Sequence, residues 1–227
     1  MNYINEVLKR IESIDQKIID RASDILIDAI KNKKKIWLFG TGHSALLSIE
    51  VYTRAGGLNI YHPVYFEELM VTDFDPFRST ELERDGAFLK EIFHKYDFQN
   101  GDVLITISNS GRNYLNVEMA LQLKEKGLTI IGLGSKEHSE VVTSRHHSAK
   151  KIIDIADIFL DNKSPSGDAI LTIKNNKYCP ISTITGSTIL HALTECIVSK
   201  INIDPFNSSN LDGNDQANLK KMGKKNN

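Results

Sequence analysis

The stretch LITISNSGRN, residues 104–113, joins the end of a buried strand to the start of a helix. Its first four residues are apolar or β-branched, as in a strand buried on both faces. In open parallel sheets, ligands bind beyond the carboxyl ends of the strands. A helix that begins there presents free N–H groups, which attract anions. The stretch therefore predicts a phosphate-binding turn made of Ser108, Asn109, Ser110, Gly111 and Asn113.

This turn lacks the G-x-x-x-x-G-K-[ST] pattern of nucleotide-hydrolysing loops and the lysine that belongs to it. A phosphomonoester that is only held therefore fits it better than a phosphate that is cleaved. The alternative interpretation is structural: Ser110 or Asn113 caps the helix, and Gly111 turns the chain.

Strands and helices alternate on both sides of this turn. The pattern predicts βαβ units around a parallel sheet that is covered by helices on both faces. Thr80 and Glu83 form a possible capping box at the start of one helix. Strands are expected at 36–39, 58–66, 102–107, 128–134 and 155–162, a hairpin with Asn175 and Asn176 at its turn at 169–181, and helices at 45–55, 79–96, 113–127 and 182–201.

The N-terminal residues 4–30 carry apolar side chains at spacings of three and four, which predicts one amphipathic helix or two in tandem. So long a stripe indicates packing on a partner subunit as well, and hence a homo-oligomer, either a dimer or a tetramer. Three regions follow: a helical segment over 1–32, one α/β domain over 33–218, and a disordered basic tail over 219–227.

The composition of the 227 residues argues against several classes of protein. A net charge of −1 gives no general attraction to nucleic acid or to an anionic membrane. No apolar run approaches the ~20 residues of a membrane-spanning helix, and the N-terminus does not have the pattern of a signal peptide. Cys179 and Cys196 lie far apart without metal-binding spacing, so we expect reduced thiols in a cytoplasmic protein.

Two further loops have the same character as the central turn. GTGHS, residues 40–44, follows a strand, and STITGST, residues 182–188, opens the late helix. A dinucleotide-binding interpretation of the first loop fails, because Ala45 stands where G-x-G-x-x-G requires its third glycine. We expect Gly42, His43, Ser44, Ser182 and Thr183 to contact the same ligand as the central turn.

Together, the three loops resemble those of the SIS (sugar isomerase) domain family. The resemblance implies a three-layer α/β/α sandwich around a mainly five-stranded parallel sheet that binds phosphosugars without a cofactor. Asn113 departs from the Ser or Thr common at its position, but its amide can still donate to phosphate. The matching positions are Gly40, Gly42 and Ser44, then Ser108, Ser110 and Gly111, then Ser182 and Thr183.

Four other segments resemble one bacterial branch of that family, the UPF0309 group. Ala149 replaces a glycine of that pattern, and the C-terminal segment also departs from it at three positions. The resemblance covers nearly the whole chain and concerns the fold and the ligand class more than the reaction. The segments are 39–58, 144–151, 156–169 and 209–218.

An aldose–ketose isomerisation needs a base, usually a carboxylate, and an acid that assists at oxygen. The resemblance implies Asp168, just before the late hydroxyl turn, as the base; the alternative is a turn aspartate that bonds its own backbone. Glu50, on the helix after the first loop, is a second candidate, or else a solvated or interface residue. His146, in a polar loop, is the candidate acid, or else a surface histidine.

Two polar clusters, His146 with His147 and the segment around Asp212, do not match known metal-binding patterns. His146 and His147 predict no metal site, because no carboxylate or thiol stands near them at zinc spacing. Asp212 does not fit a calcium loop, since Gly213 comes too early. The resemblance implies that the segment with Asp212 folds back over the pocket to bind sugar hydroxyls. His191 follows apolar Leu190 and is expected in the core.

The resemblance allows three functions. The first is a cofactor-independent sugar-phosphate isomerase. The second is a phosphosugar sensor without catalysis; residues 1–35 show no helix-turn-helix that would link a sensor to DNA. The third is a phosphosugar lyase or etherase, which would abstract the same kind of proton. A domain with several acid and base candidates favours the isomerase.

Overall fold

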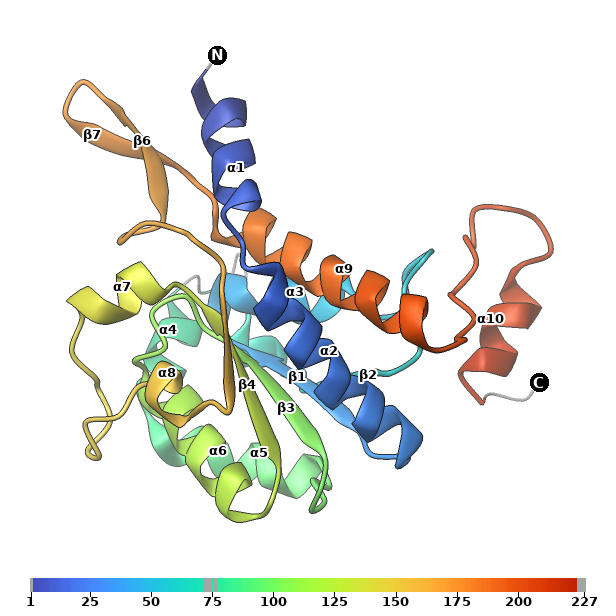
Figure 1. Ribbon diagram of the computed structural model, residues 1–227. Coiled ribbons are helices and arrows are strands. Elements are labelled where there is room, and N and C mark those ends of the chain that lie inside the picture. The colour runs from blue at the N-terminus through green and yellow to red at the C-terminus, as the bar shows by residue number, and fades with distance from the viewer. Residues whose placement is uncertain (1, 72–74, 76, 224–227) are drawn as a thin grey trace.

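The computed structural model describes residues 2–71, 75 and 77–223. Its centre is a five-stranded, all-parallel sheet in the order β2-β1-β3-β4-β5 (Figure 1). The register places Ile36 beside Val103, and Val103 beside Thr129. The strands are β1 (Ile36–Gly40), β2 (Tyr61–Pro63), β3 (Val103–Ile107), β4 (Thr129–Gly134) and β5 (Ile158–Asp161).

The sheet is buried on both faces because successive side chains of its strands point to opposite sides. Leu38 and Ile105 pack into one apolar cluster with α2 and α9. Their neighbours Trp37 and Leu104 belong to a second cluster with α5 and α6. The three-layer sandwich with a five-stranded parallel sheet is therefore confirmed.

Ten α-helices and three short 3₁₀ turns surround the sheet in the described part of the chain. Together α2 and α9 cover one face, and α5 and α6 lie on the other (Figure 1). The α-helices are α1 (Asn2–Glu12), α2 (Gln16–Lys31), α3 (Ala45–Glu50), α4 (Arg78–Leu82), α5 (Leu89–Lys95), α6 (Tyr114–Glu125), α7 (Lys136–Val141), α8 (Ile152–Ile155), α9 (Ser182–Lys200) and α10 (Asp215–Lys221), and the turns are η1 (Gly42–Ser44), η2 (Glu67–Leu69) and η3 (Gly86–Phe88).

The N-terminal stripe forms two helices rather than one. Asp15 separates them, because its side chain accepts a 3.0 Å hydrogen bond from Lys17 N and caps α2. α2 buries six residues against the core, whereas α1 buries none. In Figure 1, α1 projects from the body beside the hairpin of β6 (Ala169–Ile173) and β7 (Asn176–Pro180). The Tyr3 hydroxyl links the two by donating to Pro180 O at 2.9 Å.

Several expected elements differ in extent. The strand expected over 58–66 shortens to β2, and the helix expected over 45–55 shortens to α3. The expected helix over 79–96 is interrupted after α4, where Asp85 accepts a hydrogen bond from Ala87 N and starts η3 before α5 begins. The hairpin turn is Lys174–Asn175, both with positive φ, and Asn176 already belongs to β7. Residues 219–221 of the expected disordered tail form the last turn of α10, and 224–227 lie outside the described residues.

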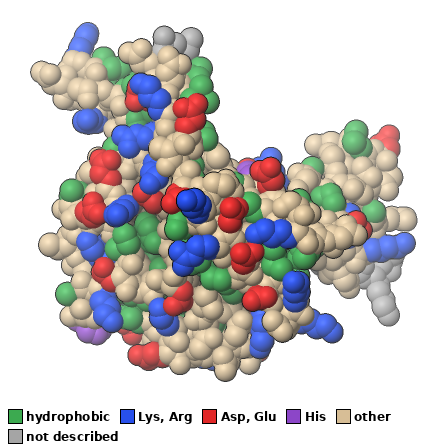
Figure 2. Space-filling model, in the orientation of Figure 1, with side chains coloured by type: hydrophobic (Ala, Val, Ile, Leu, Met, Phe, Trp, Pro, Cys, Tyr) green, Lys and Arg blue, Asp and Glu red, His purple; other side chains and the backbone are tan. Residues whose placement is uncertain are grey.

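The distribution of charged side chains on the surface agrees with the net charge of −1. On the face shown in Figure 2, basic and acidic side chains are interspersed rather than gathered by sign. None of the described helices combines the length and the apolar character that crossing a membrane requires.

Candidate functional site

A cavity of about 520 Å³ opens at the carboxyl edge of the sheet. The turn after β1 and the end of β3 both contribute to it, and the strand order reverses between these two neighbours. Open α/β sheets bind ligands at such a switch point. Its polar lining residues are Thr41, His43, Ser44, Ser79, Thr80, Glu83, Asn109, Asn162, Asp168, Ser182 and Thr183.

The first loop lies against this cavity as the sequence predicts. Gly42, His43 and Ser44 form η1 and line the cavity together. Gly40 has no room for a side chain, because a Cβ there would lie 2.6 Å from Ser44 O. The close approach turns the chain back over the end of β1 and brings the loop's polar groups to the sheet edge.

Of the central turn, only Asn109 lines the cavity. The Ser108 hydroxyl is buried and accepts a 3.2 Å hydrogen bond from Gly111 N, so it holds the turn together. Asn109 Oδ1 accepts bonds from Asn162 Nδ2 at 3.0 Å and Ser164 Oγ at 2.8 Å. Ser110 is half-buried and lies outside the cavity lining.

Asn113 does not cap α6 and does not line the cavity. Its amide nitrogen donates to Glu83 Oε1 at 2.6 Å, and its amide oxygen accepts from Arg145 Nη1, also at 2.6 Å. Thr41 Oγ1 donates to the other oxygen of Glu83 at 2.6 Å. Four side chains from four segments therefore form one hydrogen-bonded chain that ends in the cavity.

Glu83 is the cavity carboxylate that sequence reasoning missed. The expected capping box assigned it to the start of a helix, but it lies just after α4 and faces Thr41. Burial raises the pKa of Glu83, while the Thr41 hydrogen bond and the charges of Arg84 and Arg145 oppose that shift. A carboxyl group with a raised pKa holds its proton more readily and can donate it.

Asp168 is the second carboxylate in the cavity. One of its oxygens accepts from Ser182 N at 2.7 Å and Ile181 N at 3.2 Å, and the other accepts from Ser182 Oγ at 2.7 Å. Asp168 therefore caps α9 from the loop before β6. Ser182 and Thr183 line the cavity beside it, as expected.

Several sequence candidates lie outside the cavity lining, namely Glu50, Asp212, His146 and, from the central turn, Ser108, Ser110, Gly111 and Asn113. Glu50, on α3, bonds Arg54 and lies 3.3 Å from His191 Nε2. His191 is exposed on the opposite helix and not in the core, which corrects that expectation. Asp212 is exposed in the turn before α10, at the far end of the ~28 Å long α9.

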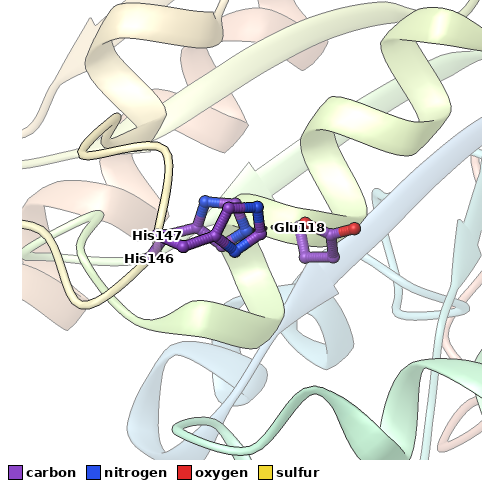
Figure 3. Close-up of side chains that lie close together, drawn as sticks. All are labelled: Glu118, His146 and His147. Atoms are coloured by element: carbon purple, nitrogen blue, oxygen red, sulfur yellow. Dashed lines mark hydrogen bonds and ion pairs between the residues drawn. The ribbon is translucent and has the colours of Figure 1, made fainter.

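His146, the expected acid, is buried and not exposed in its loop. Its Nε2 lies 2.6 Å from Glu118 Oε2 on α6, and it does not line the cavity. His147 lies over its ring, with the two ring centroids 4.0 Å apart (Figure 3). Glu118, His146 and His147 offer ligand atoms within 4.8 Å of one another, so they form a cluster able to hold a metal ion.

Comparison with known families settles the classification. The model described as the SIS domain matches residues 1–135, more than half of the chain. The chain belongs to the SIS domain family. Its similarity to UPF0309 proteins extends over nearly its full length. The one from Geobacillus thermodenitrificans is 37% identical over 222 residues, covering 95% of this chain and 89% of the relative. The one from Thermoanaerobacter pseudethanolicus is 35% identical over 238 residues, covering 99% and 96%.

Solved structures share the fold of this SIS protein at low sequence identity. A phosphoheptose isomerase from Neisseria gonorrhoeae has a TM-score of 0.59 at 18% identity, covering 87% of this chain and 96% of that one. A putative phosphosugar isomerase from Bacteroides fragilis scores 0.60 at 14%, covering 89% and 90%. The Vibrio vulnificus NanR protein complexed with ManNAc-6P scores 0.51 at 12%, covering 87% and 59%.

Some of the residues missed in this SIS protein carried a usable signal. Asn162 directly follows β5, and the rule that ligands bind beyond strand ends points to it. Thr41 stands between the two glycines of the first loop. Its hydroxyl follows a strand end, so the same rule indicates a ligand-binding position. Glu83 carried no such signal, because only the tertiary fold brings α4 against that loop.

Proposed function

We propose that this SIS protein is a cofactor-independent sugar-phosphate isomerase that interconverts an aldose and a ketose. The observation that carries the proposal is the pair of carboxylates, Glu83 and Asp168, in one cavity at the switch point of the sheet. The likeness to a phosphoheptose isomerase and a putative phosphosugar isomerase supports the ligand class.

The phosphoryl group is held by small donors at the sheet edge rather than by a lysine. Asn109, Ser44 and Thr183 line the cavity and supply an amide and two hydroxyls from the three loops. To these we add the hydroxyl of the neighbouring Ser110, which lies outside the cavity lining, on the turn that Gly111 permits with its φ of +62°. Donors of this kind bind a phosphomonoester without assisting its cleavage.

Asp168 acts as the base and Glu83 as the proton donor. Asp168 takes the proton from C2 of the open-chain aldose phosphate, and protonated Glu83 gives its proton to the carbonyl oxygen at C1. The resulting enediol then loses its O2 proton to Glu83 and receives the carbon proton at C1 from Asp168. No atom or electron is gained or lost overall, so the reaction needs no cofactor.

The test is solvent exchange with a panel of hexose, heptose and amino-sugar phosphates in D₂O, followed by NMR. We expect deuterium at C1 or C2 of one substrate, and none with Asp168→Asn. Loss of a substituent in place of exchange would identify a lyase. Absence of exchange with every sugar phosphate that the protein binds would overturn the isomerase.

A binding protein without catalysis is the second candidate, and one observation favours it. Both oxygens of Asp168 already accept hydrogen bonds from the start of α9, as a purely structural cap would. The likeness to the NanR protein complexed with ManNAc-6P supports the same ligand class. Thermal stabilisation by a sugar phosphate without deuterium exchange would identify this function.

We also propose a homo-oligomer, a dimer or tetramer, in the cytoplasm. α1 buries none of its residues, and its Ile4 and Leu8 are about half exposed, at 53% and 50%. A second copy that covers this face would bury them. Light scattering coupled to size-exclusion chromatography measures the mass. A monomer of 25.5 kDa at micromolar concentration would contradict the assembly.

A further inference from the structure

A histidine–carboxylate cluster lies on α6 and the loop over 144–151, apart from the cavity residues. The sequence offers no carboxylate near His146 and His147, and the fold supplies one from 28 positions earlier in the chain. Glu118 Oε2 lies 2.6 Å from His146 Nε2, and the His147 ring lies beside both (Figure 3). Ligand atoms of all three residues lie within 4.8 Å of one another.

Neighbouring groups hold two of these side chains in place. Ser148 Oγ lies 2.7 Å from His146 Nδ1, and the Tyr114 ring packs 4.6 Å from the His146 ring, centroid to centroid. Gln122 Nε2 donates to the second oxygen of Glu118 at 2.6 Å. Hydrogen bonds of this kind, on the atoms that face away from the metal, orient the ligands of metal sites.

We propose that Glu118, His146 and His147 bind one Zn²⁺ ion. Imidazole and carboxylate are zinc ligands, and three protein ligands leave a fourth position for water. Zinc ligands at ~2.0–2.2 Å from the ion stand roughly 3.4 Å apart. Atoms now up to 4.8 Å apart must therefore approach by up to about 1.4 Å, and the Glu118–His146 pair, now 2.6 Å apart, must separate by about 0.8 Å. His147 can supply most of that movement, because its side chain is exposed.

The proton on His146 has a place to go when zinc binds. With its ring hydrogen on Nδ1, His146 would donate to Ser148 Oγ at 2.7 Å, and its Nε2, which lies 2.6 Å from Glu118 Oε2, would be open to the ion. The weaker 3.2 Å contact from Ser148 N to Nδ1 would be given up. The imidazole stays neutral, as a metal ligand requires.

The ion would fasten the loop over 144–151 to α6. Arg145, in that loop, donates to Asn113 at 2.6 Å, and Asn113 donates to Glu83 in the cavity. Zinc binding would therefore steady the outer end of the hydrogen-bonded chain that reaches the cavity. This inference does not depend on the proposed isomerase, because the ligands are outside the cavity.

The test is calorimetric titration of ZnCl₂ into the untagged, chelator-treated full-length protein. We expect one site of micromolar or tighter affinity. His147→Ala and Glu118→Gln should each weaken binding at least tenfold. The matched controls are His94→Ala, an exposed histidine on α5, and Glu125→Gln, an exposed glutamate on the same α6. Both controls should bind zinc as the parent does.

Two results would overturn the site. One is no binding of zinc by the parent protein at tens of micromolar. The other is zinc binding that His147→Ala and Glu118→Gln leave unchanged, which would place the ion elsewhere. Circular dichroism of each variant checks its fold. His146 is left intact because it is buried and its replacement would disturb the packing.

Discussion

Thr41 Oγ1 donates a 2.6 Å hydrogen bond to Glu83 Oε2 and so ties the turn after β1 to the end of α4. The two residues are 42 positions apart and both line the cavity. The contact fixes a carboxyl group in the cavity, where burial raises its pKa. The proposed role of Glu83 as proton donor rests on this geometry.

Glu83→Gln should lower kcat by about 100-fold to 10,000-fold, the usual contribution of a general acid, and change KM little. The amide keeps one acceptor oxygen, which can still receive the bond from Asn113 Nδ2, but it has no carboxyl proton to give. In the parent protein, kcat should fall as pH rises through the raised pKa of Glu83, because only the protonated form donates. Steady-state kinetics against pH measure both.

The control for this variant is Glu81→Gln, an exposed residue on α4, which should leave kcat unchanged. A Glu83→Gln enzyme with normal kcat would make Glu83 a structural residue.

Asp168→Asn should abolish turnover and retain sugar-phosphate binding. The amide keeps an acceptor for Ser182 N but cannot abstract a proton from carbon. Loss of a capping charge at α9 should also lower the free energy of unfolding by about 1 kcal/mol. Kinetics, calorimetry with the best-binding sugar phosphate and urea denaturation separate these effects. Turnover at the parent rate would reduce Asp168 to a cap.

Ser110→Ala should weaken binding of the best-binding sugar phosphate by about tenfold. The reason is that one hydrogen bond to a charged group contributes about 1.5 kcal/mol or more. Affinity for the same sugar without phosphate should not change. Ser108→Ala should act differently: it removes the acceptor of Gly111 N and destabilises the turn itself. Calorimetry gives the affinities. Equal affinity of the parent and Ser110→Ala would exclude this serine from the phosphate site.

Gly111→Ala should destabilise the protein more than Gly167→Ala. Both glycines have positive φ, at +62° and +80°, so each alanine adds about 1 kcal/mol of backbone strain. At Gly111 the new Cβ would also lie 3.2 Å from Ile152 Cβ, whereas nothing stands within 4 Å at Gly167. The crowding should add about 1 kcal/mol or more. Urea midpoints compare the two, and equal losses would disprove the contact.

Alkaline pH should lower the free energy of unfolding because Tyr61 is buried. Burial raises its pKa from 10.0 to about 12. Since the unfolded chain releases this proton first, stability falls as pH rises from about 10 towards 12, by roughly 2–3 kcal/mol in all. Tyr61→Phe should remove that part of the loss. Denaturation of both proteins at pH 9 and pH 11 measures it, and parallel losses would contradict the assignment.

Local pattern was enough for the sheet. Runs such as LITI and IIGLG remove their apolar side chains from water only when they lie in the protein core. The glycines and small polar residues that follow these runs mark where each strand ends. The failures were at helix ends. A local turn, in which Ala87 N donates to the Asp85 side chain, divides the expected helix over 79–96. Beside it, the Glu83 side chain accepts from Asn113, which is distant in the sequence.

The sequence by itself determined the family, through the resemblance of its loop motifs, and the three-layer fold, through its periodicity. It also indicated strand ends whose loops line the cavity, because a strand end and the residues that follow it are adjacent in the chain. The tertiary structure decided which carboxylates share the cavity. It placed Glu83 beside Thr41 in the cavity and His146 beside Glu118, away from the cavity. It also left Glu50 and Asp212 outside the cavity. The physical reason is that these contacts join segments tens of residues apart, and their geometry is set by packing of whole helices on the sheet.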